Sequence, residues 1–207
     1  MVEVMIKIYQ YAPEERFGSN TYILESNGEY AVIDPSVSYQ TIISKQPQIE
    51  NKIKYILLTH CHFDHILEIK SWVSYCSSVI IGADDEEGLS DPYLNCYLGF
   101  LGISEGYFGS TVSVKDGDTL SLGGEEIRII ATPGHTPGSV CYRIRDHIFV
   151  GDTVFEKGGY GRCDLPRGDI DSLEKSLIKL LTRENDATLY PGHGNKTTIK
   201  EVITYFI

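Results

Sequence analysis

The feature that most constrains the fold of this chain is the run HCHFDH at residues 60–65, which directly follows the apolar run Tyr55–Leu58. The run holds three of the six histidines of the chain. Chance would give such a run about once in three thousand chains of this length and composition, so an accidentally histidine-rich loop explains it poorly. His60 and His62 lie two residues apart at an extended strand end. Their side chains therefore project to one side and can bind one cation.

Four local side chains do not complete two metal sites, so further ligands must come from later in the chain. Asp64 and His65 stand where the chain turns into a helix and point to a position near the first pair. His135 in TPGHTPG, Asp152 after IFVG and His193 in YPGHG each follow an apolar strand. Each also has a neighbouring glycine, which lets the backbone approach a crowded site. Imidazole and carboxylate ligands together suit zinc, iron or manganese.

The charge of the chain restricts its partners. With 18 basic and 29 acidic residues, the formal charge is −11. Nucleic-acid binding through phosphates requires a basic stripe, which the sequence does not contain. The longest apolar run is far shorter than the roughly 18 residues that a membrane span needs. We therefore expect a small-molecule substrate, no nucleic-acid partner and no membrane partner.

Cysteine usage bears on the compartment. The five cysteines are an odd number and none are spaced as CxxC, which is typical of a reducing compartment. The start of the chain has no basic segment followed by a continuous apolar one, so we expect no secretory signal. We expect a cytoplasmic protein.

The pattern of elements predicts the architecture. Because no linker or low-complexity stretch interrupts the 207 residues, we expect one domain over residues 1–207. The order of strands, helices, strands and helices favours two sheets packed face to face with helices outside, a four-layer α/β (α+β) sandwich. The expected elements are strands near 6–8, 21–24, 29–33 and 53–58, helices over 39–45 and after Asp64, an irregular stretch over 84–108, a β-rich block over 112–150, and two final helices with capping residues at Asp171 and Thr198.

The motifs HCHFDH, PGHTPGS, GDTVF and PGHG, in this order, resemble those of the metallo-β-lactamase superfamily. The resemblance implies an αββα sandwich with metals at one edge. It also implies which residues hold the metals. His60, His62 and His135 would hold the first metal, Asp64, His65 and His193 the second, and Asp152 would bridge both.

Within the superfamily, the segments GDTVF and GRCDLP are similar to the glyoxalase II-like (hydroxyacylglutathione hydrolase-like) branch. The aspartate at position 152 disfavours β-lactam hydrolysis, because the antibiotic-hydrolysing lactamases place a cysteine in this part of the site. Two departures stand out. Ile66, Leu67 and Glu68 replace the small residues that the family usually has after its last loop histidine. The chain also ends at Ile207, without the C-terminal helical extension that holds glutathione in that branch.

The resemblance implies a thioester hydrolase that works by attack of a metal-bridging hydroxide, with two divalent metal ions, zinc first among zinc, iron and manganese. Asp64 and Asp152 would be the catalytic carboxylates. Arg162 is a candidate clamp for a substrate carboxylate, although a surface pair with Asp164 or Asp169 explains it equally well. Tyr160 is a second candidate substrate-binding residue with the same ambiguity.

Two alternatives remain open at this point. A persulfide dioxygenase would hold one iron on His60, His135 and Asp152, and a non-catalytic metal-binding module would use the same ligands without chemistry. Other side chains near the motifs have plainer interpretations. Cys61 alternates with the histidines and should point into the core, and Cys163 has no group that would activate it. His147 has no motif around it and is interpreted as a surface residue.

Overall fold

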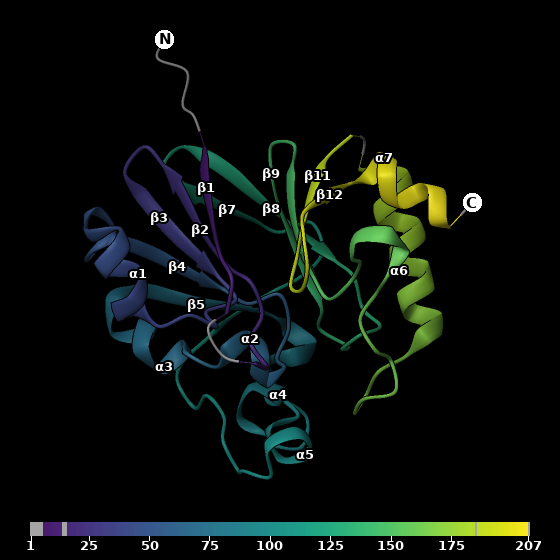
Figure 1. The fold of residues 1–207 in the computed structure, drawn as a ribbon, viewed down its shortest axis with the longest axis horizontal. Helices are drawn as coiled ribbons and strands as arrows, with labels where there is room; N and C mark the ends of the chain where they lie inside the picture. The colour runs from purple at the N-terminus through teal and green to yellow at the C-terminus, as the bar shows by residue number, and fades with distance from the viewer. Residues whose placement is uncertain (1–5, 14–15, 185, 207) are drawn as a thin grey trace.

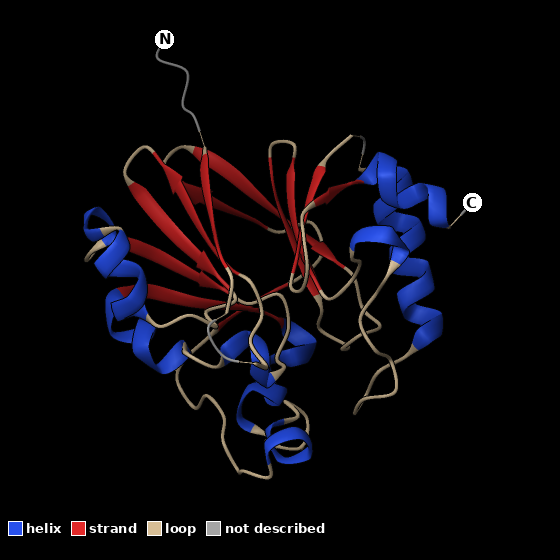
Figure 2. Ribbon diagram, in the orientation of Figure 1, coloured by secondary structure: helices blue, strands red, loops and turns tan. Residues whose placement is uncertain are grey.

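The protein is described by a computed structural model that covers residues 6–13, 16–184 and 186–206. Two six-stranded sheets pack face to face (Figure 2). The first sheet contains, in spatial order, β1 (Lys7–Tyr11), β2 (Thr21–Ser26), β3 (Glu29–Ile33), β4 (Ile53–Leu57), β5 (Cys76–Gly82) and β6 (Val112–Val114). The second contains, in spatial order, β12 (Thr197–Thr198), β11 (Thr188–Pro191), β10 (His147–Gly151), β9 (Val140–Ile144), β8 (Glu125–Ala131) and β7 (Thr119–Leu122).

Helices cover the outer face of each sheet (Figure 1). The first sheet is covered by α1 (Tyr39–Lys45) and α3 (Ile69–Trp72), and the second by α6 (Ile170–Arg183) and α7 (Ile199–Val202). Three short helices lie at the lower edge in Figure 1, namely α2 (Phe63–Ile66), α4 (Glu86–Ser90) and α5 (Tyr97–Leu101). Short 3-10 turns occupy Pro47–Ile49, Val73–Tyr75, Ala83–Asp85, Glu156–Gly158 and Ile203–Tyr205. The predicted four-layer sandwich is confirmed.

Three apolar clusters lie between the four layers. Because side chains alternate along a strand, one strand supplies two clusters. Ile23 of β2 packs toward the helices of the first sheet, while its neighbours Tyr22 and Leu24 pack between the two sheets. In the second sheet, Ile129 of β8 faces the first sheet and Ile130 faces α6 and α7. The strands are therefore buried on both faces, which explains their nearly continuous apolar runs.

Strand direction places several loops at one edge of the sandwich. The strands β3, β4 and β5 are parallel, so their carboxyl ends lie together. In the second sheet β10 and β11 are parallel, and β8 runs in the same direction because both β8 and β10 are antiparallel to β9. The loops that follow these strands form the lower edge in Figure 1. In sheets of this kind the carboxyl ends of the strands are where ligands bind.

Most local predictions are confirmed, and two need correction. The helix over 39–45 and the capping box at Thr198 occur as expected. The single helix expected after Asp64 is instead two short helices, because the Glu68 N–H leaves the helix and donates to the carbonyl of Pro35. The long helix α6 is capped by Asp169 rather than Asp171, since the Asp169 carboxylate accepts from the N–H of Ser172.

The long apolar segment that a membrane span needs does not occur in any helix of the described residues.

Candidate metal centre

The three histidines predicted to share the first metal meet at one point, although His135 is more than seventy residues from the other two in sequence. The Nε2 atoms of His60 and His135 lie 3.2 Å apart, and the Nδ1 atom of His62 lies 2.9 Å from His135 Nε2. All three rings are buried. Three imidazole nitrogens at this spacing can hold one metal ion.

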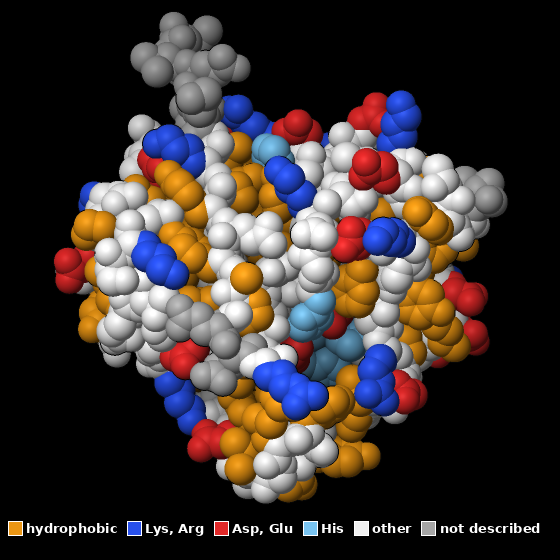
Figure 3. All heavy atoms as spheres, in the orientation of Figure 1, with side chains coloured by type: hydrophobic (Ala, Val, Ile, Leu, Met, Phe, Trp, Pro, Cys, Tyr) orange, Lys and Arg blue, Asp and Glu red, His pale blue; other side chains and the backbone are white. Residues whose placement is uncertain are grey.

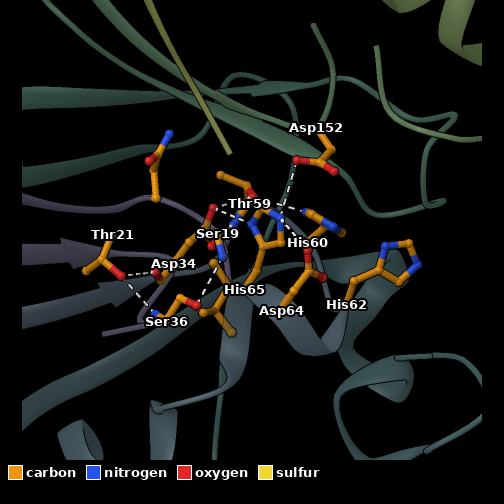
Figure 4. Close-up of polar contacts among 12 residues, drawn as sticks. Ser19, Thr21, Asp34, Ser36, Thr59, His60, His62, Asp64, His65 and Asp152 are labelled. Atoms are coloured by element: carbon orange, nitrogen blue, oxygen red, sulfur yellow. Dashed lines mark hydrogen bonds and ion pairs between the residues drawn. The ribbon is translucent and has the colours of Figure 1, made fainter. Parts of the chain in front are cut away.

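The second predicted group also comes together. The Nε2 atom of His193 lies 3.0 Å from Asp64 Oδ2, and His65 Nε2 lies 3.7 Å from the same oxygen. Asp152 stands between the groups. Its Oδ1 lies 3.3 Å from His65 Nε2, and its Oδ2 lies 3.7 Å from His135 Nε2. Figure 4 shows Asp152 approaching from the second sheet, opposite the HCHFDH loop on the first. One carboxylate therefore reaches both groups of ligands.

Hydrogen bonds on the far side of each ring fix which nitrogen carries a proton. The carbonyl of Arg162 only accepts, so the Nδ1–H of His135 must donate to it, at 2.7 Å. The hydroxyl of Thr59 already donates to Asp34, so it accepts from the Nδ1–H of His60. The Nδ1 of His65 lies 2.8 Å from the Asp34 carboxylate, which likewise places a proton there. These partners leave the Nε2 atoms of His60, His65 and His135 facing inward.

This arrangement suits a cation. Two lone pairs 3.2 Å apart, on His60 and His135, repel each other unless a positive charge lies between them. Among the described residues, His65 Nε2 and Asp152 Oδ1 are buried atoms without a hydrogen bond, although they lie only 3.3 Å apart. Leaving two such atoms unsatisfied costs about 1–3 kcal/mol each, and coordination removes that cost. The nitrogen and carboxylate donors fit zinc, iron or manganese.

Charge in the centre is distributed unevenly. Burial, followed by the neighbouring histidines, lowers the pKa of His60 well below its usual range and that of His62 to about 3. Burial alone would lower the pKa of His65, but Asp34, Asp64 and Asp152 outweigh it and raise that pKa well above its ordinary value. His60 and His62 are thus neutral at pH 7, which is the form that binds metals.

Asp34 was missed as a site residue, because the sequence suggested only a strand followed by a turn. Its carboxylate accepts from the backbone N–H and the hydroxyl of Thr59, at 2.8 and 2.7 Å, and also contacts His65. Figure 4 shows it to the left of the histidines, with Thr59 and Ser19 beside it. Its φ of 50° is in the left-handed region, a strained conformation for a residue other than glycine. The contacts that Asp34 makes hold it there and orient two rings of the centre.

A second missed carboxylate, Asp85, joins two of the ligand loops. It accepts from the N–H of Cys61 at 3.0 Å, from the N–H of Gly138 at 2.7 Å and from the hydroxyl of Thr136 at 2.6 Å. Cys61 lies in the HCHFDH loop, and the other two lie in the loop of His135. Asp85 therefore fixes the distance between the two loops. The run GADDEE did not predict this role. It contains four acidic residues in a row, of which only Asp85 is buried, and the sequence alone does not distinguish it from the other three.

Two glycines let the loops come close enough. A Cβ atom on Gly192 would lie 2.4 Å from Asp152 Oδ1, and one on Gly161 would lie 2.7 Å from His135 Nδ1. Neither distance is tolerable for a side chain, so both positions require glycine.

The centre lies at the bottom of a cavity of about 360 Å³. Basic and apolar side chains surround the histidine-lined hollow in Figure 3. The outer lining is formed by Arg16, Phe17, Phe100, Phe155, Tyr160 and Arg162. The two candidate substrate-binding residues, Tyr160 and Arg162, thus lie beside the cavity.

The side chain of Arg162 is already engaged. It makes two hydrogen bonds of 2.8 Å to Asp164, which is the surface pair considered from the sequence, and it lies over the ring of Phe100. Its carbonyl contributes to the centre through His135. The prediction that Cys61 points into the core is confirmed. His147 lies outside the cluster as expected, but it is half-buried against the hydroxyl of Tyr190 rather than on the open surface.

Comparison with known proteins identifies relatives. The sequence pattern of the metallo-beta-lactamase superfamily matches residues 15–193. The hydroxyacylglutathione hydrolase GloC of Haemophilus influenzae is 30% identical over 194 residues, which cover 90% of this chain and 91% of that protein. The probable polyketide biosynthesis zinc-dependent hydrolase BaeB of Bacillus velezensis is 29% identical, with 91% of this chain and 79% of that protein covered. The crystal structure of BLEG-1 B3 metallo-beta-lactamase superposes with a TM-score of 0.85 at 29% identity, covering 96% of this chain and 97% of that one.

Proposed function

The chain belongs to the metallo-beta-lactamase superfamily, and from this premise we propose that it is a metal-dependent hydrolase of acyl thioesters with a binuclear centre. The observation that carries the proposal is that Asp152 lies within 3.7 Å of histidines from both ligand groups. A carboxylate within reach of both ligand groups would be suited to hold two ions.

The distances above support the ligand set that the family resemblance implies. His60, His62 and His135 would hold the first ion, and the second would be held by Asp64, His65 and His193, with Asp152 common to both. The choice of zinc is supported by the name of BaeB, a zinc-dependent hydrolase. It is also supported by the donor set, which is rich in imidazole.

Two ions held by these residues would supply a hydroxide at neutral pH and polarise the thioester carbonyl. Among the chain's own residues, Asp64 would act on the attacking water. Asp64 Oδ2 can accept a hydrogen bond from the attacking water and orient it, since it lies at the floor of the cavity between His65 and His193. The leaving thiol has an ordinary pKa of about 8.5, so it departs as a thiolate and needs no dedicated general acid.

The substrate class is supported by the relative GloC, whose name specifies a hydroxyacylglutathione, which is an acyl thioester. A small molecule also fits a cavity of about 360 Å³, and the net charge of −11 disfavours nucleic acid and anionic membranes. We further propose that residues 1–207 act as one domain, because the two sheets share an apolar cluster. A cytoplasmic location is supported by the cysteines, all five of which are free.

The test is hydrolysis by the metal-loaded protein of S-lactoylglutathione and a panel of other acyl thioesters, with oxygen uptake followed in parallel. We expect thioester cleavage without oxygen consumption. One bound iron and thiol-dependent oxygen uptake would instead establish the persulfide dioxygenase alternative on His60, His135 and Asp152. A metal-loaded protein that cleaves no thioester, lactone, phosphodiester or β-lactam would favour the non-catalytic module. The β-lactam is included because of the relative BLEG-1.

A further inference from the structure

The segment of residues 16–20 lies between β1 and β2. It is hydrogen-bonded to both loops that carry the second ligand group, which consists of Asp64, His65 and His193. The N–H of Ser19 donates to the carbonyl of Asp64 at 3.1 Å, and the N–H of Asn20 donates to the carbonyl of Gly192 at 2.7 Å. The side-chain amide of Asn20 adds bonds of 3.0 Å to the carbonyls of Pro191 and Gly194. The segment is therefore fixed against the metal centre.

Ser36 also holds the segment in place. The N–H of Ser19 is shared between the carbonyl of Asp64 and the hydroxyl of Ser36, at 3.0 Å from the latter. A Cβ atom on Gly18 would lie 2.6 Å from that same hydroxyl, so the two segments are in close contact. Arg16 stands three residues before Ser19, so its Cα lies within about 11 Å of the anchored position. An arginine side chain spans most of that distance, and Arg16 lines the cavity.

Arg16 differs from Arg162 in its partners. Arg162 is held by two hydrogen bonds to Asp164. No carboxylate of the described residues lies within 4.0 Å of the guanidinium of Arg16, which stands 5.6 Å from the ring centroid of Phe17. Among the described residues the guanidinium thus has no acidic partner, and a cation in this position beside a cavity attracts an anion. A guanidinium also presents paired donors that match a carboxylate.

The rest of the rim indicates what kind of anion fits. Phe17, Phe100 and Tyr160 come from three separate segments, yet all border the cavity and are 45%, 45% and 46% exposed. Exposed apolar side chains around one hollow favour an organic ligand over a small hydrated ion.

We propose that Arg16 is a specificity-determining residue that binds a carboxylate of the thioester substrate, an inference that rests on the proposed function. The carboxylate can belong to the acyl portion or to the thiol portion, and the recognition chemistry is the same in both cases.

Two pairs of synthetic thioesters test the proposal and separate the two sources. S-lactoyl-N-acetylcysteine carries its carboxylate on the thiol portion, and S-lactoyl-N-acetylcysteamine is its neutral counterpart. S-succinyl-N-acetylcysteamine carries it on the acyl portion, with S-butyryl-N-acetylcysteamine as the neutral counterpart. We expect the metal-loaded wild-type chain to favour the charged member of at least one pair in kcat/KM.

The expected effect of Arg16→Ala is a fall of about ten- to a hundredfold in that preference, which is the usual weight of a charge-assisted hydrogen bond. Arg16→Lys should keep part of the preference, because it keeps the charge without the planar fork. Arg167→Ala is the matched control. It removes one positive charge from a surface pair with Glu87, outside the cavity lining, and should keep the full preference. Equal losses on charged and neutral thioesters in Arg16→Ala, or no wild-type preference, would overturn the proposal.

A binding measurement separates this proposal from the proposed function. Calorimetry with S-ethyl-N-acetylcysteine and S-(3-carboxypropyl)-N-acetylcysteamine, two thioethers that cannot be hydrolysed, is compared with neutral S-ethyl-N-acetylcysteamine. If the wild type cleaves no thioester but binds a charged thioether in an Arg16-dependent manner, only the proposed function fails. If it cleaves thioesters and Arg16→Ala leaves the charge preference intact in both assays, only the role of Arg16 fails.

Discussion

Two aspartates at the same edge of the sandwich, Asp85 and Asp152, show how differently a protein can use a carboxylate beside its core. Both stand just beyond the carboxyl end of an inner strand. Asp85 accepts three hydrogen bonds that satisfy both of its oxygens. Asp152 has a buried oxygen without a hydrogen bond and faces histidines instead. The donors around a carboxylate, more than its burial, thus distinguish a structural tie from a place where a cation binds.

The pKa values of the two aspartates diverge for the same reason. Burial raises the pKa of Asp85, and its hydrogen bonds only partly offset that rise. Burial would also raise the pKa of Asp152, but the positive charge of His65 and its neighbours outweighs it and lowers that pKa. Asp152 is therefore an anion at any physiological pH, ready to balance positive charge.

The largest expected effect comes from Asp152→Ala. Because this change removes the carboxylate that reaches both ligand groups, we expect the loss of both metal ions and a fall of at least about a thousandfold in thioester hydrolysis. The metal-free variant should be less stable than the metal-free wild type at pH 7, because a carboxylate whose pKa is lowered on folding stabilises the protein above its unfolded-state pKa. Metal analysis, kinetics and denaturant unfolding measure the three quantities. A variant that keeps one equivalent of metal and its activity would contradict the bridging role.

Asp85→Ala should act through the scaffold rather than through the metal ions. Three donors lose their acceptor, so we expect the free energy of unfolding to fall by about 3–5 kcal/mol, in the metal-free and the metal-loaded protein alike. Urea unfolding of both forms measures this fall. If the loss appeared only in the metal-loaded form, Asp85 would belong to the metal centre rather than to the scaffold. The distinction drawn between Asp85 and Asp152 would then be wrong.

Glu184 tests whether a lowered pKa is by itself a sign of a metal ligand. Burial alone would raise its pKa, but hydrogen bonds from Arg128 and Arg143 outweigh it and lower it. The side chain is only 6% exposed. We expect Glu184→Gln to leave metal content unchanged and to cost about 1–3 kcal/mol of stability at pH 7.

The pH dependence of that cost has a definite sign. A carboxylate whose pKa is lowered on folding stabilises the protein above its unfolded-state pKa and stops doing so as the pH falls through the folded-state pKa. The difference in unfolding free energy between wild type and Glu184→Gln should therefore shrink as the solution is acidified below the ordinary glutamate pKa. A difference that stays constant from pH 7 to pH 3 would show that the charge of Glu184 is not the cause.

The smallest effect is expected at His147, the histidine that the motifs leave out. Its ring makes one half-buried hydrogen bond to the hydroxyl of Tyr190, so His147→Ala should cost less than about 1 kcal/mol and leave metal content unchanged. Metal analysis beside Asp152→Ala checks this. Similar metal losses in the two variants would show that the ligands are wrongly assigned.

Much of the fold and of the centre was predictable, because each ligand stands in a motif at the end of an apolar strand. The contacts that hold the ligand loops in place were not predictable. Asp34 and Asp85 act on residues about 25 positions away in sequence, and nothing in their own surroundings distinguishes them from turn residues. The break of the helix after Asp64 depends on the carbonyl of Pro35, another distant group. Such contacts exist only once the sheets have assembled.

The most direct test of the binuclear assignment is the metal content of the purified chain after saturation with zinc, measured by mass spectrometry against protein concentration. Seven converging side chains in two groups, joined by Asp152, predict two equivalents per chain. Saturation at a single equivalent, or no tightly bound metal at all, would contradict that prediction.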